Sequence, residues 1–147
     1  DRSDVIFDLL SRTDAPSYGS QLARGATSLS EAWDANPKSS QNHLMLGHAE
    51  AWFHEWLAGI QIDLSRPAGE QIVIRPTPVG DVTRARARHE SALGEIVVAW
   101  ERAGDHFKLT LTAPANVRVQ LPDRSIASAP AGVSMHECLF EGSGGRV

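Results

Sequence analysis

Residues 95–113 read EIVVAWERAGDHFKLTLTA, and apolar and polar side chains alternate on both sides of a short polar interruption. The apolar residues that recur at every second position are Ile96, Val98, Trp100, Phe107, Leu109 and Leu111. A period of two places them on one face of extended backbone, so the stretch predicts two half-buried strands. The connection RAGDHF contains a glycine and is typical of a hairpin, so the strands are expected to pair antiparallel.

The same period extends along the rest of the C-terminal part of the chain. Val117, Val119 and Leu121 alternate with polar residues, and IVIRP in 72–76 is a further short apolar run. The segments TAPAN and LPDRS are turns between strands. Residues 67–147 therefore predict an antiparallel β-sandwich of about five to seven strands.

Residues 1–66 have a helical period instead. A short amphipathic helix is expected over 3–12 with Ser3 as its N-cap, and a second, shorter one is expected within 20–34, weakened by Gly25. A long buried helix is expected to begin at a cap formed by Ser39 or Ser40 and to end near Gly59. Its apolar stripe consists of Met45, Ala49, Trp52, Phe53, Trp56, Leu57 and Ile60.

The change of period places the domain boundary near 65–69, which gives a helical segment, 1–66, and a β segment, 67–147. Three helices bury too little apolar surface to enclose a core of their own. The stripe with Trp52, Phe53 and Trp56 is therefore expected to pack on the sheet or on a helical domain outside this chain. Where the stripe stays uncovered, self-association is expected.

Composition excludes several classes of function. The chain has 147 residues and a net charge of −4, and 1–66 holds nine acidic residues against five Lys and Arg. Nucleic acid is not expected as a partner, because phosphate binding requires an excess of basic charge. No apolar run reaches the roughly 20 residues that span a bilayer, and neither a membrane nor a targeting segment is expected. The single cysteine, Cys138, excludes an intrachain disulfide.

Several motifs have an ordinary structural explanation. Glu50 and His54 are four residues apart on a helix, where surface pairing is favoured over metal binding, so no metal site is expected. Cys138 is expected to be a small sheet residue. The segment GSGG in 142–145 is expected to be a flexible terminus, since it lacks the length and the following helix of a phosphate loop. Arg84, Arg86 and Arg88 alternate with alanines and are expected to be solvated or paired across strands with Glu90, Glu95 or Glu101.

One carboxylate stands apart from other charges. Glu31 lies in GATSLSEAWDANPKSSQNH, residues 25–43, among small side chains and upstream of His43. Considered alone, it is a solvated or capping glutamate more often than a site residue.

Three stretches together carry a family resemblance. The stretches are DLLSRTDAPSYGSQLARGATSLSEAWD, SSQNHLMLGHAEAWFHEWLAGIQID and IVIRPTPVGDVTRARARHESALGEIVVAWER, followed by APANVRVQLP and a terminal GSG. They resemble the C-terminal part of glycoside hydrolase family 78, the bacterial α-L-rhamnosidases. The resemblance implies the terminal helices of an (α/α)6 catalytic barrel, followed by a C-terminal β-sandwich. It also implies that the remainder of the barrel is a partner of this segment.

The resemblance also implies roles for individual residues. Glu31 matches the general base of an inverting glycosidase, and His43 matches a histidine that binds the sugar. Trp33 matches the family pattern and either offers its face to the sugar or packs in the barrel wall. Tyr18 stands where the family often has a tryptophan, and its implied role is also substrate binding. Two further departures are Ser30 in place of a tryptophan and Ala32 in place of an arginine, which put the fit of the substrate in question.

Two functions from different classes remain open at this point. The first is a part of an inverting hydrolase that removes terminal α-L-rhamnose from glycosides or polysaccharides, with a rhamnose-containing glycoside as substrate and no cofactor. The isolated chain is then expected to be inactive, because Glu31 is one of two required carboxyl groups. The second is a non-catalytic carbohydrate-binding or structural β-module whose helices dock it to a neighbour.

Overall fold

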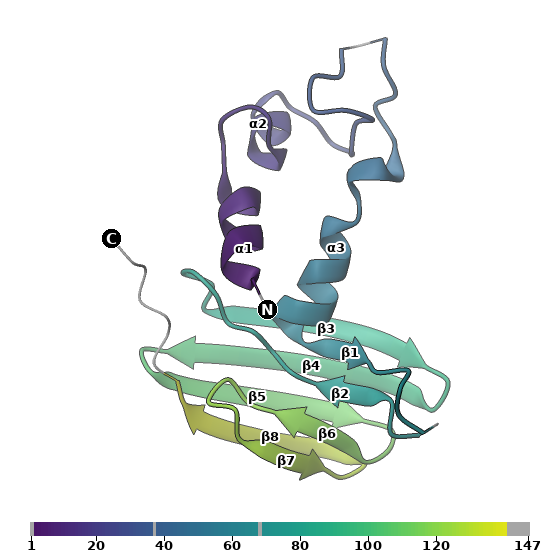
Figure 1. Ribbon diagram of the computed structural model, residues 1–147, viewed down its shortest axis with the longest axis vertical. Helices are drawn as coiled ribbons and strands as arrows, with labels where there is room; N and C mark the ends of the chain where they lie inside the picture. Colours follow the sequence, from purple (N-terminus) through teal and green to yellow (C-terminus); the bar gives the residue numbers. More distant parts are fainter. Residues whose placement is uncertain (1, 37, 68, 141–147) are drawn as a thin grey trace. The chain divides into compact units, whose positions relative to one another are not determined.

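The computed structural model describes residues 2–36, 38–67 and 69–140. These residues fall into two compact units that divide between Trp52 and Phe53. A helical unit precedes the division, and a unit built mainly of strands follows it (Figure 1). The order of α then β predicted from the change of period is confirmed.

The helical unit contains two short helices followed by a long loop and a further helical stretch. Its elements are α1 (Ser3–Ser11), α2 (Tyr18–Ala23), the 3₁₀ turn η1 (Leu44–Leu46) and α3 (Ala49–Trp52). Helix α1 was expected to be capped by Ser3, but Arg2 occupies the N-cap position. Ser3 is instead a buried residue of the first turn, and its hydroxyl accepts a hydrogen bond from Trp52 Nε1 at 3.2 Å.

Helix α2 has a complete cap and an early end. The Ser17 hydroxyl accepts from the Ser20 backbone N–H at 3.0 Å, and the Ser20 hydroxyl accepts from the Ser17 N–H at 3.3 Å. This reciprocal pair satisfies two donors that a helix start leaves open. Gly25 has φ +82°, in the left-handed region that glycine adopts at least cost, and the helix stops before it.

The long helix expected from Ser39 or Ser40 to Gly59 is wrong in its first half. His43 caps only the single turn η1, and the regular helix begins at Ala49 and passes into a π-helical turn, η2 (Phe53–Ala58). The expected apolar stripe is also only partly buried. Trp52 and Leu57 are buried and Trp56 is half-buried, whereas Met45 is 61% exposed and Phe53 45% exposed.

The apolar surface of the helical unit is consistent with the expected lack of a closed core. Large apolar side chains are exposed on α1, α2 and η1, namely Val5, Leu9, Leu22, Leu44 and Met45. Self-association of the isolated chain therefore remains a prediction. None of the helices within the described ranges combines the length and the apolar character that a membrane crossing requires.

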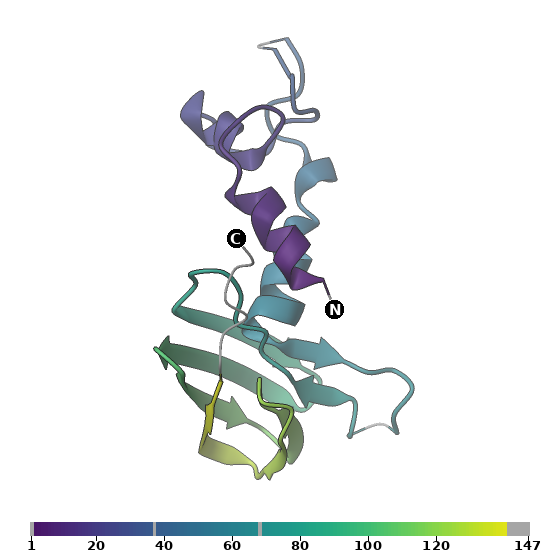
Figure 2. The same cartoon turned by 60° about the vertical axis from the view of Figure 1, so that its left-hand side comes forward.

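The β unit contains two four-stranded sheets. Sheet A has the order β1 (Ile60–Ile62), β2 (Ile72–Ile74), β6 (Val117–Gln120) and β7 (Ile126–Ala129). Sheet B has the order β3 (Arg84–Ser91), β4 (Gly94–Ala103), β5 (His106–Ala113) and β8 (Gly132–Leu139). The two sheets form a sandwich, and the β1–β2 hairpin projects beyond it (Figure 2).

The alternation in 95–113 forms the centre of sheet B, as the sequence predicts. Strands β4 and β5 pair antiparallel with Trp100 opposite Leu109, and the connection turns at Gly104. The alternating apolar residues of both strands are all buried. Trp100 lies 5.6 Å from Phe107 between ring centroids, and its Nε1–H donates to the Leu57 carbonyl of η2 at 2.8 Å.

Three features of the sandwich differ from the prediction. The described residues contain eight strands. One pair of strands, β2 and β6, is parallel, with Val73 opposite Arg118. Strand β1 begins at Ile60, before the boundary expected between 66 and 67. Gly59 explains the early start: it has φ +92°, and a Cβ there would lie 2.2 Å from the Pro76 nitrogen. Only glycine allows this close approach, which lets the chain leave η2 directly into β1.

Candidate functional site

The segments that carry Glu31 and His43 are held side by side in the helical unit. The His43 backbone N–H donates to the Leu29 carbonyl at 2.7 Å, and the Glu31 N–H donates to the Ser40 carbonyl at 3.1 Å. The Ser28 hydroxyl donates to the Gln41 carbonyl and adds a third bond between the same two stretches. Two residues that are distant in sequence thus lie on neighbouring stretches of backbone.

The backbone around Glu31 is fixed by a buried side chain from α2. Gln21 is 4% exposed, and its Nε2–H donates to the Ser30 hydroxyl at 2.8 Å. The Ser30 hydroxyl in turn donates to the Ala32 carbonyl at 2.9 Å. These bonds hold the residues on either side of Glu31, and they give Ser30, one of the departures from the family pattern, a defined structural role.

The Glu31 side chain itself is half-buried and remains available. Among the described residues, none forms a hydrogen bond or an ion pair with its carboxylate. A carboxylate with this freedom can accept a proton from water, which a tight ion pair would oppose. Asp34, three residues further, is exposed.

Tyr18 and Trp33 form an aromatic pair in the same unit. Their ring centroids lie 4.9 Å apart and the planes are nearly perpendicular, at 84°. The Tyr18 hydroxyl donates to the Leu46 carbonyl at 2.5 Å, and burial raises the pKa of Tyr18. The Arg24 guanidinium donates to the Trp33 carbonyl at 2.9 Å. The pair is therefore anchored through both of its members.

The ring of His43 has a defined tautomer in its neutral form. Its Nδ1 accepts a hydrogen bond from the Met45 backbone N–H at 3.1 Å, so the proton of the neutral ring is on Nε2. The half-buried ring can therefore offer Nε2–H as a donor to a hydroxyl or carbonyl oxygen.

Gln21 and Arg24 were not identified from the sequence. For Gln21, the sequence offers one indication of a structural role, namely its position in α2 beside Ser20. Both side chains are buried in the structure. Buried polar residues have partners, but the sequence does not show that the partner of Gln21 is the serine beside Glu31.

The Gln21–Ser30 contact makes a measurable prediction. Gln21→Met keeps the volume of the side chain but leaves the buried Ser30 hydroxyl without its donor, which costs about 1–3 kcal/mol. We expect faster hydrogen exchange of the Glu31 amide, which lies between Ser30 and Ala32 and whose N–H donates to the Ser40 carbonyl. Gln71→Met is the matched control, because the Gln71 amide also donates to a backbone carbonyl, that of Arg66 at 3.3 Å, but lies in the β unit. Equal exchange in the two variants would contradict a positioning role for Gln21.

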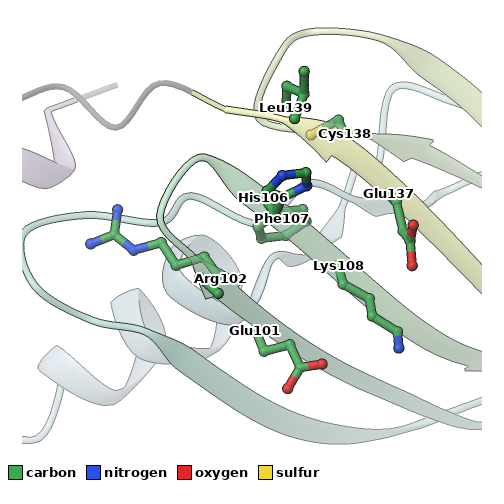
Figure 3. A pocket seen from close by; sticks show the side chains of 9 residues that line it. Glu101, Arg102, His106, Phe107, Lys108, Glu137, Cys138 and Leu139 are labelled. Carbon is green, nitrogen blue, oxygen red and sulfur yellow. The ribbon is translucent and has the colours of Figure 1, made fainter.

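The groove of the β unit shown in Figure 3 is lined by described residues that do not form a catalytic constellation. The groove shown in Figure 3, about 480 Å³, lies on sheet B and includes a row of cross-strand neighbours, Glu101, Lys108 and Glu137. Cys138 also lines it. Cys138 is a half-buried strand residue, as expected, and burial raises the pKa of its thiol, which disfavours the nucleophilic thiolate.

Among the remaining motifs, the arginines of β3 have the structural role that the sequence favours. Arg88 forms ion pairs with Glu90 and Glu95, and Arg84 lies opposite Glu101 in the β3–β4 register. No group of three His, Cys, Asp or Glu side chains within the described part of the chain is arranged to hold a metal ion. The GSGG segment lies outside the described residues.

Comparison with known proteins assigns a family to both parts of the chain. Residues 1–57 match the model of the bacterial alpha-L-rhamnosidase 6 hairpin glycosidase domain. Residues 59–132 match the bacterial alpha-L-rhamnosidase C-terminal domain. The chain belongs to the bacterial alpha-L-rhamnosidase family. The resemblance stated from the sequence motifs is therefore confirmed, and the helices are those of the end of the 6 hairpin domain.

Individual alpha-L-rhamnosidases are similar over most of this chain. The enzyme of Streptomyces avermitilis is 33% identical over 137 residues, which covers 83% of this chain and 13% of the relative. The enzyme of Alteromonas sp. (strain LOR) is 27% identical over 128 residues, which covers 81% of this chain and 14% of the relative. The chain thus spans about one seventh of the length of these curated relatives.

Two solved structures share the fold. The alpha-L-rhamnosidase of Dictyoglumus thermophilum superposes with a TM-score of 0.80 at 22% identity, over 91% of this chain and 18% of that structure. The Streptomyces avermitilis alpha-L-rhamnosidase, solved in complex with L-rhamnose, superposes with a TM-score of 0.79 at 27% identity, over 92% of this chain and 16% of that structure.

Proposed function

We propose that this chain completes the catalytic barrel of an inverting α-L-rhamnosidase and supplies its general base, Glu31. The observation that carries the proposal is the pairing of the Glu31 and His43 segments inside a stretch that matches the glycosidase domain. Within this proposal, 1–66 contributes to the barrel and 67–147 forms the C-terminal β-sandwich, except that β1 (Ile60–Ile62) belongs to the sandwich. Terminal α-L-rhamnose on a glycoside or polysaccharide is the proposed substrate.

The chemistry of inversion explains why a free carboxylate is required. One carboxyl group protonates the leaving oxygen while a second, roughly 6.5–9.5 Å away, removes a proton from the attacking water on the opposite face of the sugar. Glu31 suits the second task, because the side chains on either side of it are small and no cationic side chain that the structure describes holds its carboxylate. The water that Glu31 deprotonates attacks the anomeric carbon as the glycosidic bond breaks.

The neighbours of Glu31 are proposed to bind the sugar. His43 donates through Nε2–H to a ring hydroxyl, since its Nδ1 already accepts from Met45. Trp33 offers apolar aromatic surface to the C–H face of rhamnose, and Tyr18 fixes the orientation of that ring through their edge-to-face contact. Ala32 leaves open the space that an arginine occupies in the family pattern, so this enzyme is proposed to recognise the sugar there without a guanidinium.

The isolated 147-residue chain is expected to hydrolyse nothing. It supplies one carboxylate of the pair, and the general acid belongs to the rest of the barrel. An assay on an aryl α-L-rhamnoside should give the uncatalysed rate, and turnover should appear only when the remainder of the barrel is supplied in the same polypeptide. Turnover by the chain alone that disappears in Glu31→Gln would contradict the proposed incomplete site.

The alternative, a non-catalytic carbohydrate-binding module, has less support from the β unit. Such modules use exposed aromatic rings as platforms for sugars. On the described strands, the Phe, Tyr and Trp side chains are Trp100 and Phe107, and both are buried. Trp56 of η2 is half-buried, with the Arg75 guanidinium 5.1 Å from its ring centroid.

A further inference from the structure

The outer face of sheet A carries a groove of about 380 Å³ with an excess of positive charge. Three arginines and two glutamines line it, together with one carboxylate, Asp63. All of these residues belong to the β unit, and they come from β1, β2, β6 and the β1–β2 connection, together with Arg75, which directly follows β2. The groove is therefore formed within one compact unit, and Glu31 belongs to the other.

The single carboxylate of the groove is already occupied. Asp63 accepts hydrogen bonds from the Ser65 N–H at 3.0 Å and the Ser65 hydroxyl at 2.5 Å, and it pairs with Arg66 Nε at 3.3 Å. Arg66 also lies 4.0 Å from Glu70. Asp63 and Arg66 thus balance each other, and the positive charge left in the groove belongs to the other two arginines.

Those two arginines, Arg75 and Arg118, are half-buried in the groove. Among the described residues, neither has a carboxylate within ion-pair distance. Arg75 is held over the Trp56 ring, an arrangement that leaves the in-plane N–H groups of its guanidinium free to donate. A partly desolvated guanidinium without an anion is a binding group for one, because burial strengthens a charge-assisted hydrogen bond.

The register of the strands brings the two guanidinium groups toward the same place. Val73 of β2 lies opposite Arg118 of β6, and Arg75 follows two residues after Val73 on the same face. Strand spacing and rise put the two arginine Cα atoms roughly 8 Å apart, within the reach of both side chains for a shared oxyanion. Gln61 of β1 lies opposite Val73, and Gln120 lies two residues after Arg118. One N–H of the Gln61 amide already donates to the Glu55 carbonyl at 3.0 Å, so Gln61 offers its second N–H and its Oε1.

We propose that this groove binds an acidic sugar unit, with its carboxylate on Arg75 and Arg118 and its hydroxyls on the amides of Gln61 and Gln120. Guanidinium groups match the planar, two-oxygen geometry of a carboxylate, and primary amides match hydroxyls that both donate and accept. The groove would bind an acidic unit of a saccharide, in addition to the neutral terminal sugar proposed to bind near Glu31. Binding in the groove does not involve Glu31.

The groove on sheet B shows why charge alone does not make such a site. There Lys108 lies between Glu101 and Glu137 on neighbouring strands, and Arg84 lies opposite Glu101. The charges alternate across the sheet, so cross-strand neighbours satisfy one another. On sheet A the corresponding neighbours of Arg118 are Val73 and Ser128, and neither neutralises it.

The test is an NMR titration of the ¹⁵N-labelled 147-residue chain with glucuronate, and with glucose and acetate as separate probes. We expect glucuronate to bind with a dissociation constant on the order of 1 mM. The shifts should be confined to Val73 and the side-chain amides of Gln61 and Gln120. Glucose and acetate should each bind at least about tenfold more weakly. Glucose lacks the carboxylate that would contact the arginines, and acetate lacks the hydroxyls that would contact the glutamine amides.

Substitutions separate this site from general attraction to positive charge. Arg118→Gln should weaken glucuronate binding at least about tenfold, and Arg118→Lys, which keeps the charge but loses the paired donors, by a smaller factor. Arg86→Gln on β3 is the matched control, since exposed Arg86 lies opposite Ala99, and it should leave binding unchanged. Unchanged amide dispersion in each variant establishes that the chain remains folded.

Three results would overturn the proposal. The first is equal binding of acetate and glucuronate, which would indicate an anion contact without recognition of the sugar. The second is an equal loss of affinity in the Arg118 and Arg86 variants. The third is a set of shifts spread over both sheets. None of these results bears on catalysis by Glu31, so the two proposals fail separately.

Discussion

Replacing Glu31 by Gln in a catalytically complete protein that contains this chain is expected to lower kcat by about 10²- to 10⁴-fold and to leave KM nearly unchanged. General-base assistance contributes a factor of that order. Glutamine keeps the shape and hydrogen-bonding capacity of the side chain but cannot take the proton from water. An interaction made mainly in the transition state affects kcat and kcat/KM together, so steady-state kinetics on an aryl α-L-rhamnoside is the measurement.

Azide provides the chemical control for this experiment. A small anionic nucleophile needs no base, and Glu31→Ala opens space for it in front of the anomeric carbon. Azide should therefore restore turnover of Glu31→Ala and form the glycosyl azide of inverted configuration, provided that the general acid is intact. Asp34→Asn is the matched substitution, because exposed Asp34 is a nearby carboxylate outside the proposed site. A kcat within about twofold of wild type for Glu31→Gln is too small a change for a lost base and would make Glu31 a binding or structural residue.

The second large effect is expected in the core of the β unit. Trp100→Ala should lower the free energy of unfolding by about 3–5 kcal/mol, the range for removing a large buried aromatic side chain. Trp100 is 2% exposed, it lies against Phe107, and its Nε1–H donates to the Leu57 carbonyl. The substitution therefore removes apolar contacts and also leaves a buried carbonyl of η2 without its donor.

Urea denaturation followed by far-UV circular dichroism measures this loss without depending on tryptophan fluorescence. Trp100→Phe should have a smaller effect, because it keeps most of the packing and loses the hydrogen bond. Val133→Ala on β8 is the matched control, since Val133 is 71% exposed and surface substitutions change stability by about 0.5 kcal/mol or less. Equal losses for Trp100→Ala and Val133→Ala would exclude Trp100 as the link between η2 and sheet B.

The strands were predictable because local alternation decides them. Ile96 through Leu111 repeat with a period of two, and a slip by one residue would turn every apolar side chain outward. The helix before Gly59 was overextended at its start, where 40–48 form a loop and the single turn η1. The Ser40 carbonyl accepts from the Glu31 N–H and the His43 N–H donates to the Leu29 carbonyl, and local sequence does not contain these pairings.

The candidate site was predictable only in part. The motif match gave Glu31, His43, Trp33 and Tyr18. In the structure, backbone hydrogen bonds join the Glu31 and His43 segments, and the Tyr18 and Trp33 rings are in edge-to-face contact. Their catalytic and binding roles remain predictions. The contact of Gln21 with Ser30 could not be predicted, because a polar residue in a short helix has many potential partners and the three-dimensional arrangement selects one of them.

The parallel pairing of β2 with β6 has a consequence for the order in which the protein folds. Strands β3, β4 and β5 connect through short turns, so their contacts are local and can form early. Strands β1 and β2 form a hairpin near the beginning of the β unit, but sheet A cannot grow beyond it until Val117–Gln120 has left the ribosome. The edge of β2 that later pairs with β6 is therefore unpaired while the middle of sheet B folds. An unpaired strand edge can pair with a wrong strand, so this hairpin is at risk of mispairing during synthesis.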